Sequence, residues 1–278
     1  MMKLWNRLFL EERPSISLSF FRMAVALTTG FHVLPTFCHL NDNYFPTALK
    51  SVNTNFFPIG VIQWVQQSPE PLITAMVGVF IVSWFFFLIG FLSQISCIVM
   101  LAGCYFFYAL NSFHVGTLSW DILLVTLFVM CVTGYHGDYF SIDGLRKNNL
   151  DAYKRLRPYF IQRLLQMQVG CTYFYTALYK VTAEGNWIKG NPLYYVMNYP
   201  FEGVTKTFLL RDFIFDKPQL CYWLGITIVV IEFSMVFLLF WRKTRVAGIY
   251  LGVFFHIALI LTLDVPAIFF FLFPAQLF

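Results

Sequence analysis

The sequence contains few charged residues. Asp, Glu, Lys and Arg make up only 12% of the 278 residues, about half of the ~25% found in an ordinary soluble domain. Hydrophobic residues make up 59%, and phenylalanine alone contributes 34 positions. A water-soluble fold of this size could not bury so much apolar surface. The composition therefore excludes an ordinary soluble enzyme and predicts a chain that lies in the membrane.

The motifs of common soluble sites are also missing. The six cysteines form no CxxC pair and no metal-ligand spacing, and neither a GxSxG elbow nor a phosphate-binding glycine loop is present. No metal is therefore expected. We expect most cysteines to pack inside helices, and we consider Cys38 and Cys221, near one face of the membrane, as the pair for a disulfide. The net charge of +5 sits mostly in loops, where membrane topology explains it, so no nucleic-acid partner is predicted.

Long apolar runs recur along the chain, each close to the ~20 residues that a helix needs to cross a bilayer. The runs are continuous and do not alternate with period two, which favours helices over a barrel. We predict an all-α, polytopic transmembrane helix bundle of about seven to eight spans, forming one domain over 1–278 with no soluble domain. The predicted spans are 16–38, 72–92, 95–110, 118–135, 159–180, 219–240 and 247–263, with a short eighth segment over 266–278. The first is interpreted as a retained span, because it lacks a small-residue cleavage site.

Basic residues orient these spans. They gather before the first span, in the 136–158 loop and in the turn before the seventh span, and all three places fall on one side of the predicted topology. The clusters are Lys3, Arg7 and Arg13; Arg146, Lys147, Lys154, Arg155 and Arg157; and Arg242, Lys243 and Arg245. The positive-inside rule then predicts a cytoplasmic amino terminus. Loops 39–71 and 181–218 should form the outer mouth of any site.

Ionisable residues within the spans are candidates for function, because each costs about 2.5–3.5 kcal/mol to insert unless it is paired or wetted. They are Arg22, His32, Asp121, Lys180, Glu232, His256 and Asp264. Arg22 lies near the cytoplasmic end of the first span, where its side chain is expected to snorkel to the surface. His39, His114 and His136 lie at span ends or in loops and are interpreted as solvated.

The helix predicted over 159–180 has one face of polar or small residues. These recur at steps of three and four: Arg163, Gln166, Gly170, Tyr173, Ala177 and Lys180. Such a face belongs inside a bundle. Two interpretations of Lys180 stay open: it snorkels to the outer interface, or it lies in a dry cavity where a fraction of neutral amine acts as a general base. Glu232 or Asp121 would be its ion-pair partner. For Glu232 and His256, a structural hydrogen bond is the alternative to catalysis.

Seven segments, in order, resemble one family. They are SFFRMAVAL (19–27), WDILL (120–124), YFSIDGLR (139–146), YFYTALYKV (173–181), NWIKGNPLYYV (186–196), IEFSMVFLLF (231–240) and GVFFHIALILTLDVPAIFFF (252–271). The chain is similar to the horizontally transferred transmembrane (HTTM) domain family, which includes the membrane part of vitamin K-dependent gamma-glutamyl carboxylase. The resemblance extends over nearly the whole chain.

This resemblance implies a lipid-quinol-dependent oxygenase or carboxylase-like enzyme whose active site opens to the outer face. The cofactor would be a reduced lipid quinone of the vitamin K or menaquinol type, and Lys180 would be the base that deprotonates it. His256 matches a histidine in the late span, and Trp187 and Gly190 match a WxxG that follows the lysine. The second functional histidine of the carboxylase has no clear match; its place falls near Trp120 or Asp121. The predicted catalytic residues are Lys180, His256, Glu232 and Asp121, and the predicted substrate-binding residues are Tyr173, Gln166, Trp187 and His32.

The carboxylase also has a large lumenal region with no counterpart here, so protein carboxylation by this chain alone is not expected. The alternative function is a non-enzymatic accessory membrane protein for maturation or export of a secreted toxin peptide. A transporter is less favoured, because no inverted repeat or pair of broken helices is visible. In each case the partners are the lipid bilayer and a hydrophobic or peptide substrate. The expected location is an integral, multi-pass position in the plasma membrane, or the inner membrane of a bacterium.

Overall fold

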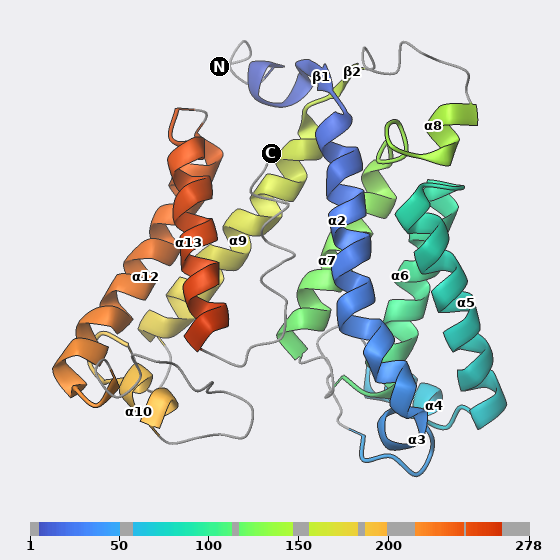
Figure 1. Cartoon of the computed structure of the whole chain (residues 1–278), viewed down its shortest axis with the longest axis horizontal. Helices are drawn as coiled ribbons and strands as arrows, with labels where there is room; N and C mark the ends of the chain where they lie inside the picture. The colour runs from blue at the N-terminus through green and yellow to red at the C-terminus, as the bar shows by residue number, and fades with distance from the viewer. Residues whose placement is uncertain are drawn as a thin grey trace. The chain divides into compact units, whose positions relative to one another are not determined.

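The computed structural model describes residues 6–50, 58–112, 117–146, 156–182, 187–198, 215–241 and 243–262, and it is mostly helical (Figure 1). The chain divides into two compact units. Among the described residues, the first unit comprises those up to Leu164, and the second unit comprises those from Leu165 to Thr262.

Each of the seven predicted main spans contains a long helix that begins within two residues of its predicted start. The helices are α2 (Ile16–Val33), α5 (Glu70–Ile89), α6 (Ser93–Leu110), α7 (Thr117–Thr133), α9 (Phe160–Thr182), α12 (Pro218–Phe240) and α13 (Arg245–Thr262). Four helical stretches are long and apolar enough to cross a bilayer: Ile16–Asn43, Glu70–Ile89, Ser93–Leu110 and Pro218–Phe240. Four such stretches indicate a multi-pass membrane protein. The predicted short segment over 266–278 lies outside the described residues.

Shorter elements connect or flank these helices. They are η1 (Asn6–Leu10), β1 (Glu12–Pro14), η2 (Leu34–His39), α3 (Leu40–Asn43), α4 (Ile59–Gln66), α8 (Ile142–Arg146), β2 (Leu156–Pro158) and α10 (Pro192–Asn198). Helix α2 gives way to the 3₁₀ turn η2 at Pro35, near the start of that turn, because proline has no N–H to continue the α-helical bonds. Helix α5 ends three residues before the predicted limit, because Gly90 takes a left-handed conformation with φ 68°.

The all-α prediction missed a short antiparallel ladder between β1 and β2 (Figure 1). Arg13 and Arg157 face each other across it, and like charges in that position are unfavourable. Each charge has a carboxylate partner: Arg13 lies 3.0 Å from Glu11, and Arg157 lies 2.8 Å from Asp138. The Asp138 carboxylate raises the pKa of Arg157. The ladder therefore brings Arg13 and Arg157, which come from two of the three basic clusters, next to each other.

Close helix contacts in the first unit depend on glycine. A Cβ at Gly30 of α2 would lie 2.7 Å from the Trp84 ring of α5, and a Cβ at Gly103 of α6 would lie 2.8 Å from the Phe80 ring. The Trp84 indole donates a 2.7 Å hydrogen bond to the Ala26 carbonyl. Glycine at a crossing lets backbones and large rings approach closely, which provides packing energy where water supplies no hydrophobic drive.

The YFSIDGLR segment builds a cap on helix α6. The Asp143 carboxylate accepts hydrogen bonds from the Leu92 N–H at 2.9 Å and from the N–H and hydroxyl of Ser93, both at 2.7 Å. These N–H groups belong to the first turn of α6, where no intrahelical acceptor exists and a negative charge is favoured. Within the YFSIDGLR segment itself, the Ser141 hydroxyl accepts a hydrogen bond from the Gly144 N–H at 2.9 Å. The segment therefore has a structural role at the end of the first unit.

Arg22 does not snorkel, contrary to the prediction. Its residue is fully buried, and its Nη2 donates to the Phe140 carbonyl at 2.6 Å. The guanidinium lies against Gly90 and interacts electrostatically with Asp143. The Phe140 carbonyl and the electrostatic attraction of Asp143 therefore compensate part of the buried charge.

Gly90→Ala should destabilise the protein by at least about 2 kcal/mol. The left-handed backbone disfavours a Cβ by about 1–2 kcal/mol, and the new atom would lie 1.7 Å from Nη1 of Arg22 and 2.3 Å from Cβ of Ser141. Thermal unfolding in detergent or nanodiscs measures the change. Gly78→Ala is the matched control on the same helix, since a Cβ there meets no atom within 4 Å. Equal stability of the two variants would contradict the described packing.

His136 is buried, and the expectation that it is solvated was wrong. It is 2% exposed, its Nε2 lies 3.1 Å from the Ser93 carbonyl, and its ring packs edge-on against Phe87. Burial lowers its pKa from 6.5 to about 4, because the charged imidazolium is poorly solvated there. Loop position suggested exposure, but the cap over α6 encloses the residue.

The lowered pKa of His136 makes stability depend on pH. Between pH 6.5 and 4 the unfolded chain binds a proton that the folded chain excludes, so stability is fully present above pH 6.5 and falls as pH drops toward 4. The expected loss is about 3 kcal/mol at pH 4, at 1.36 kcal/mol per pKa unit. His136→Gln should flatten the pH profile of unfolding. The same change at exposed His39 should leave the wild-type slope, and a slope equally steep in His136→Gln would contradict this assignment.

Candidate functional site

The predicted site residues are divided between the two units. The second unit contains Lys180, Glu232, Tyr173, His256, Gln166 and Trp187. Asp121 and His32 belong to the first unit. Asp121 interacts with the Tyr108 hydroxyl group of α6, and His32 lies in the last turn of α2.

Helix α9 carries the main candidates on its buried face, as its periodicity predicted. Gln166 is 8% exposed, Tyr173 is 3% exposed and Ala177 is fully buried. On the other side of the helix, Tyr175 is 66% exposed and Tyr179 is 72% exposed. The polar and small face therefore contacts protein, while bulky aromatic side chains cover the outer face.

Lys180 and Glu232 form an ion pair between α9 and α12. The Lys180 amine donates to both carboxylate oxygens of Glu232, at 2.7 and 2.8 Å. The Lys180 side chain is 19% exposed and that of Glu232 is 7% exposed. Glu232, one of the two predicted partners, contacts Lys180 within this unit. Two charges removed from water in this way are stable mainly because each compensates the other.

Trp187 covers the amine. The Lys180 Nζ lies 5.5 Å from the centre of the Trp187 ring, within cation–π range. The Trp187 backbone N–H donates to the Lys180 backbone carbonyl at 2.9 Å. A Cβ at Gly225 of α12 would lie 3.3 Å from the indole, so the ring packs against that helix. It also contacts the apolar cluster of Leu193, Met197, Phe215 and Cys221. An apolar ring therefore packs against the Lys180 side of the ion pair.

A second polar contact joins α9 to α13. The Tyr173 hydroxyl lies 2.5 Å from Nε2 of His256, and the His256 ring also packs against Phe255. His256 is fully buried. Tyr173 and Lys180 are seven residues apart, so their side chains lie about two turns apart on the same helix face. This helix therefore presents two groups that can hold or transfer a proton.

The structure also shows what lies apart from these groups. Cys38 and Cys221 are both free thiols, so the disulfide considered for them is not formed. Asp264 lies outside the described residues. Among the residues that are described, no group of three or more His, Cys, Asp or Glu side chains could hold a metal ion.

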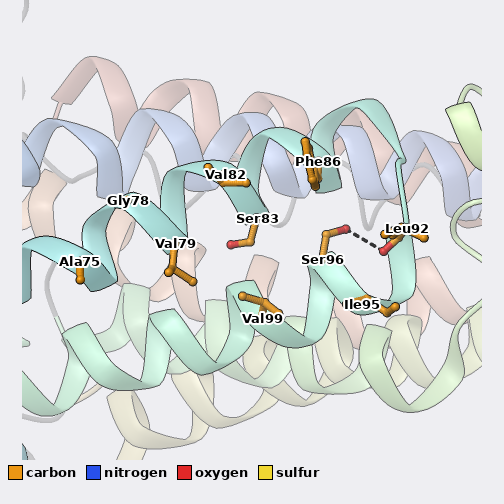
Figure 2. A pocket seen from close by; sticks show the side chains of 10 residues that line it. All are labelled: Ala75, Gly78, Val79, Val82, Ser83, Phe86, Leu92, Ile95, Ser96 and Val99. Carbon is orange, nitrogen blue, oxygen red and sulfur yellow. Dashed lines mark hydrogen bonds between the residues drawn. The ribbon is translucent and has the colours of Figure 1, made fainter. Parts of the chain in front are cut away.

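A groove of about 500 Å³ runs along α5 and α6 in the first unit (Figure 2). Its walls are Ala75, Gly78, Val79, Val82, Ser83, Phe86, Leu92, Ile95, Ser96 and Val99. Figure 2 shows the Ser96 hydroxyl directed at the Leu92 carbonyl, to which it donates at 3.1 Å. The groove contains none of the predicted site residues and no ionisable side chain. The groove therefore offers a mostly apolar surface and no side chain that could act as an acid or a base.

The helices and the buried polar pairs define a class: multi-pass helical membrane proteins with ionisable groups inside the helix bundle. A comparison with known families matches residues 11–274 to the HTTM domain. The chain belongs to the HTTM domain family, as its seven segments predicted. No curated protein and no solved structure gave a significant match.

Proposed function

We propose that this chain is a membrane enzyme that removes a proton from a reduced lipid quinone at the Lys180–Glu232 pair. The observation that carries the proposal is the pair itself: an amine and a carboxylate in two-point contact between α9 and α12, mostly shielded from water. Ionisable groups placed at such a cost inside a helical membrane protein are functional candidates by default. With the amino terminus cytoplasmic, the pair faces the outer half of the bilayer.

The pair supplies a base without adding net charge to the membrane interior. Transfer of one proton from the Lys180 ammonium to the Glu232 carboxylate, 2.7 Å away, leaves a neutral amine beside a neutral acid. The amine then accepts the proton of a substrate hydroxyl, and the restored ammonium attracts the negative charge that develops on oxygen. Lys180 is thus the base, and Glu232 orients it and stores its proton.

The surroundings fit a flat, hydrophobic ligand with hydroxyl groups. The Trp187 ring lies over the amine, and α9 exposes the aromatic side chains of Phe174, Tyr175 and Tyr179. Lys180 keeps 19% of its side chain accessible, enough for contact from one side. When bound, a hydroquinone of the vitamin K or menaquinol type would supply reducing electrons and reactivity toward oxygen.

Tyr173 and His256 are proposed as a proton-relay and orienting pair. Their 2.5 Å contact lets a proton pass between the phenol and the imidazole, and burial of both groups fixes their geometry. Gln166 and Trp187 are proposed to contact substrate from the same unit. Roles for Asp121 and His32 rest on the sequence alone.

The test is epoxide formation by the full chain in nanodiscs, with vitamin K hydroquinone or menaquinol and oxygen. Lys180→Ala should lower the rate of product formation at least 10²-fold, in the usual range for loss of a general base. Lys189→Ala is the matched control, because Lys189 is an exposed lysine in the same segment. Absence of product with wild-type protein, or an undiminished rate in Lys180→Ala, would reject the proposal. Specific binding of a secreted peptide without turnover would favour the accessory function.

A further inference from the structure

Two cysteines on neighbouring helices of the first unit lie in direct contact. The Cys131 thiol of α7 donates to the sulfur of Cys97 in α6, with the two Sγ atoms 3.3 Å apart. Cys97 is fully buried, and Cys131 is half-buried. The sequence did not predict this contact, because 33 residues lie between the two cysteines and they belong to different helices.

Both helices fix this contact. Helices α6 and α7 pack against each other, and the Gln94 side-chain amide donates to the Cys131 carbonyl. The Cys97 sulfur lies 3.9 Å from the Leu127 carbonyl, one turn earlier on α7. Other contacts between α6 and α7 therefore hold the two thiols close together.

The spacing indicates a dithiol that can close, and does not fit a metal centre. Two sulfurs on one tetrahedral zinc lie about 3.8 Å apart, given Zn–S bonds of about 2.3 Å. The observed 3.3 Å is shorter, and no third ligand completes a metal group among the residues that the structure describes. A disulfide needs an S–S distance of about 2.05 Å. Closure therefore requires the sulfurs to approach by a little over 1 Å.

We propose that Cys97 and Cys131 form an oxidisable dithiol that closes to a disulfide within the membrane, with a lipid-soluble quinone as the oxidant. The two S–H bonds break and one S–S bond forms. The two electrons and two protons released pass to the two oxygens of the quinone, which becomes a hydroquinone. The disulfide would link α6 to α7. This site uses none of the residues of the proposed lysine site.

A quinone is the class of oxidant that fits this position. Cys97 and Cys131 lie in apolar helices, where hydrophobic molecules partition and charged aqueous oxidants do not. A quinone accepts two electrons and two protons, which are the numbers that disulfide formation releases. Cys131 is the thiol with partial exposure, so it is the one that the oxidant reaches first.

The test uses the full chain in nanodiscs, reduced and then treated with duroquinone, whose fully substituted ring cannot add thiols. Peptide mapping by mass spectrometry should find a 97–131 cross-link with loss of two hydrogens, and both cysteines should become at least tenfold less reactive to alkylation after denaturation. Cys97→Ser and Cys131→Ser should each abolish the cross-link. Full alkylation of both cysteines in treated wild type would overturn the proposal, and this readout does not depend on whether a variant folds.

Two controls separate the site from general oxidation. Cys104 is buried on the same helix α6, and Cys104→Ser should leave the 97–131 cross-link unchanged. Oxidised glutathione, which stays in water, should form the cross-link at least tenfold more slowly than duroquinone. Equal rates with the two reagents would overturn the assignment of a lipid-soluble oxidant, and equal cross-linking among other cysteine pairs would overturn the specificity of the site.

Discussion

Replacing Glu232 with glutamine lowers the free energy of unfolding by about 3 kcal/mol. In the wild-type protein, the Glu232 carboxylate contributes both acceptor oxygens for the Lys180 ammonium. The variant removes this carboxylate and leaves the ammonium mostly shielded from water. Removal of one partner of a buried ion pair costs about 3–5 kcal/mol, because the remaining charge is uncompensated. The lower end applies because the lysine side chain is 19% exposed and water can reach it in part. Thermal or denaturant unfolding in nanodiscs measures the loss.

The double variant Lys180→Met with Glu232→Gln separates charge from packing. It removes both charges and keeps similar volumes, so it should recover most of the stability that either single change loses. Under the proposed function the double variant stays inactive, because it has no amine at position 180 to accept the substrate proton. Strictly additive losses in the double variant would contradict the ion-pair account, whereas activity in that variant would contradict the role of Lys180.

Removing the carboxylate of Asp143 is expected to cost about 3 kcal/mol. Asp143→Ala deletes three charge-assisted hydrogen bonds to the start of α6, and loss of a helix cap alone costs about 0.5–2 kcal/mol. It also removes the electrostatic interaction between Asp143 and the buried Arg22 guanidinium. Both effects act in the same direction, and a lowered melting temperature should report them.

Asp42→Asn is the control for this second change. Asp42 is an exposed acidic residue at the opposite end of the first unit, in α3 (Figure 1), and surface changes of this kind usually stay within ±0.5 kcal/mol. Asp143→Asn should fall between the two, because its amide oxygen can still accept one bond. A loss below 1 kcal/mol in Asp143→Ala would show that the cap is not needed for stability.

The starts of the membrane helices were predictable from local chemistry. Apolar run length follows from the thickness of the bilayer, and the polar or small face of α9 follows from helical periodicity. Both are properties of neighbouring residues, so they need no knowledge of the fold. The burial of Gln166, Tyr173 and Ala177 confirms that face.

The errors share one cause, which is that the surroundings of a residue come from distant parts of the chain. Position at a helix end suggested water for Arg22 and His136, but the capping turn around Asp143 encloses both. The ladder of β1 and β2 joins segments more than 140 residues apart, and three residues of strand leave no readable pattern. Pairing of such segments depends on loop closure and packing, which composition does not encode.

The sequence by itself determined that this protein is a helical membrane protein of the HTTM family and that Lys180 shares a helix face with polar and small residues, since hydropathy, periodicity and family motifs are linear properties. Only the tertiary structure decided that Glu232 pairs with that lysine, that Tyr173 meets His256, and that Cys97 touches Cys131. Each of these contacts joins two different helices. Their partners are selected by how the helices pack, and in the bilayer that packing rests on close fit and paired polar groups.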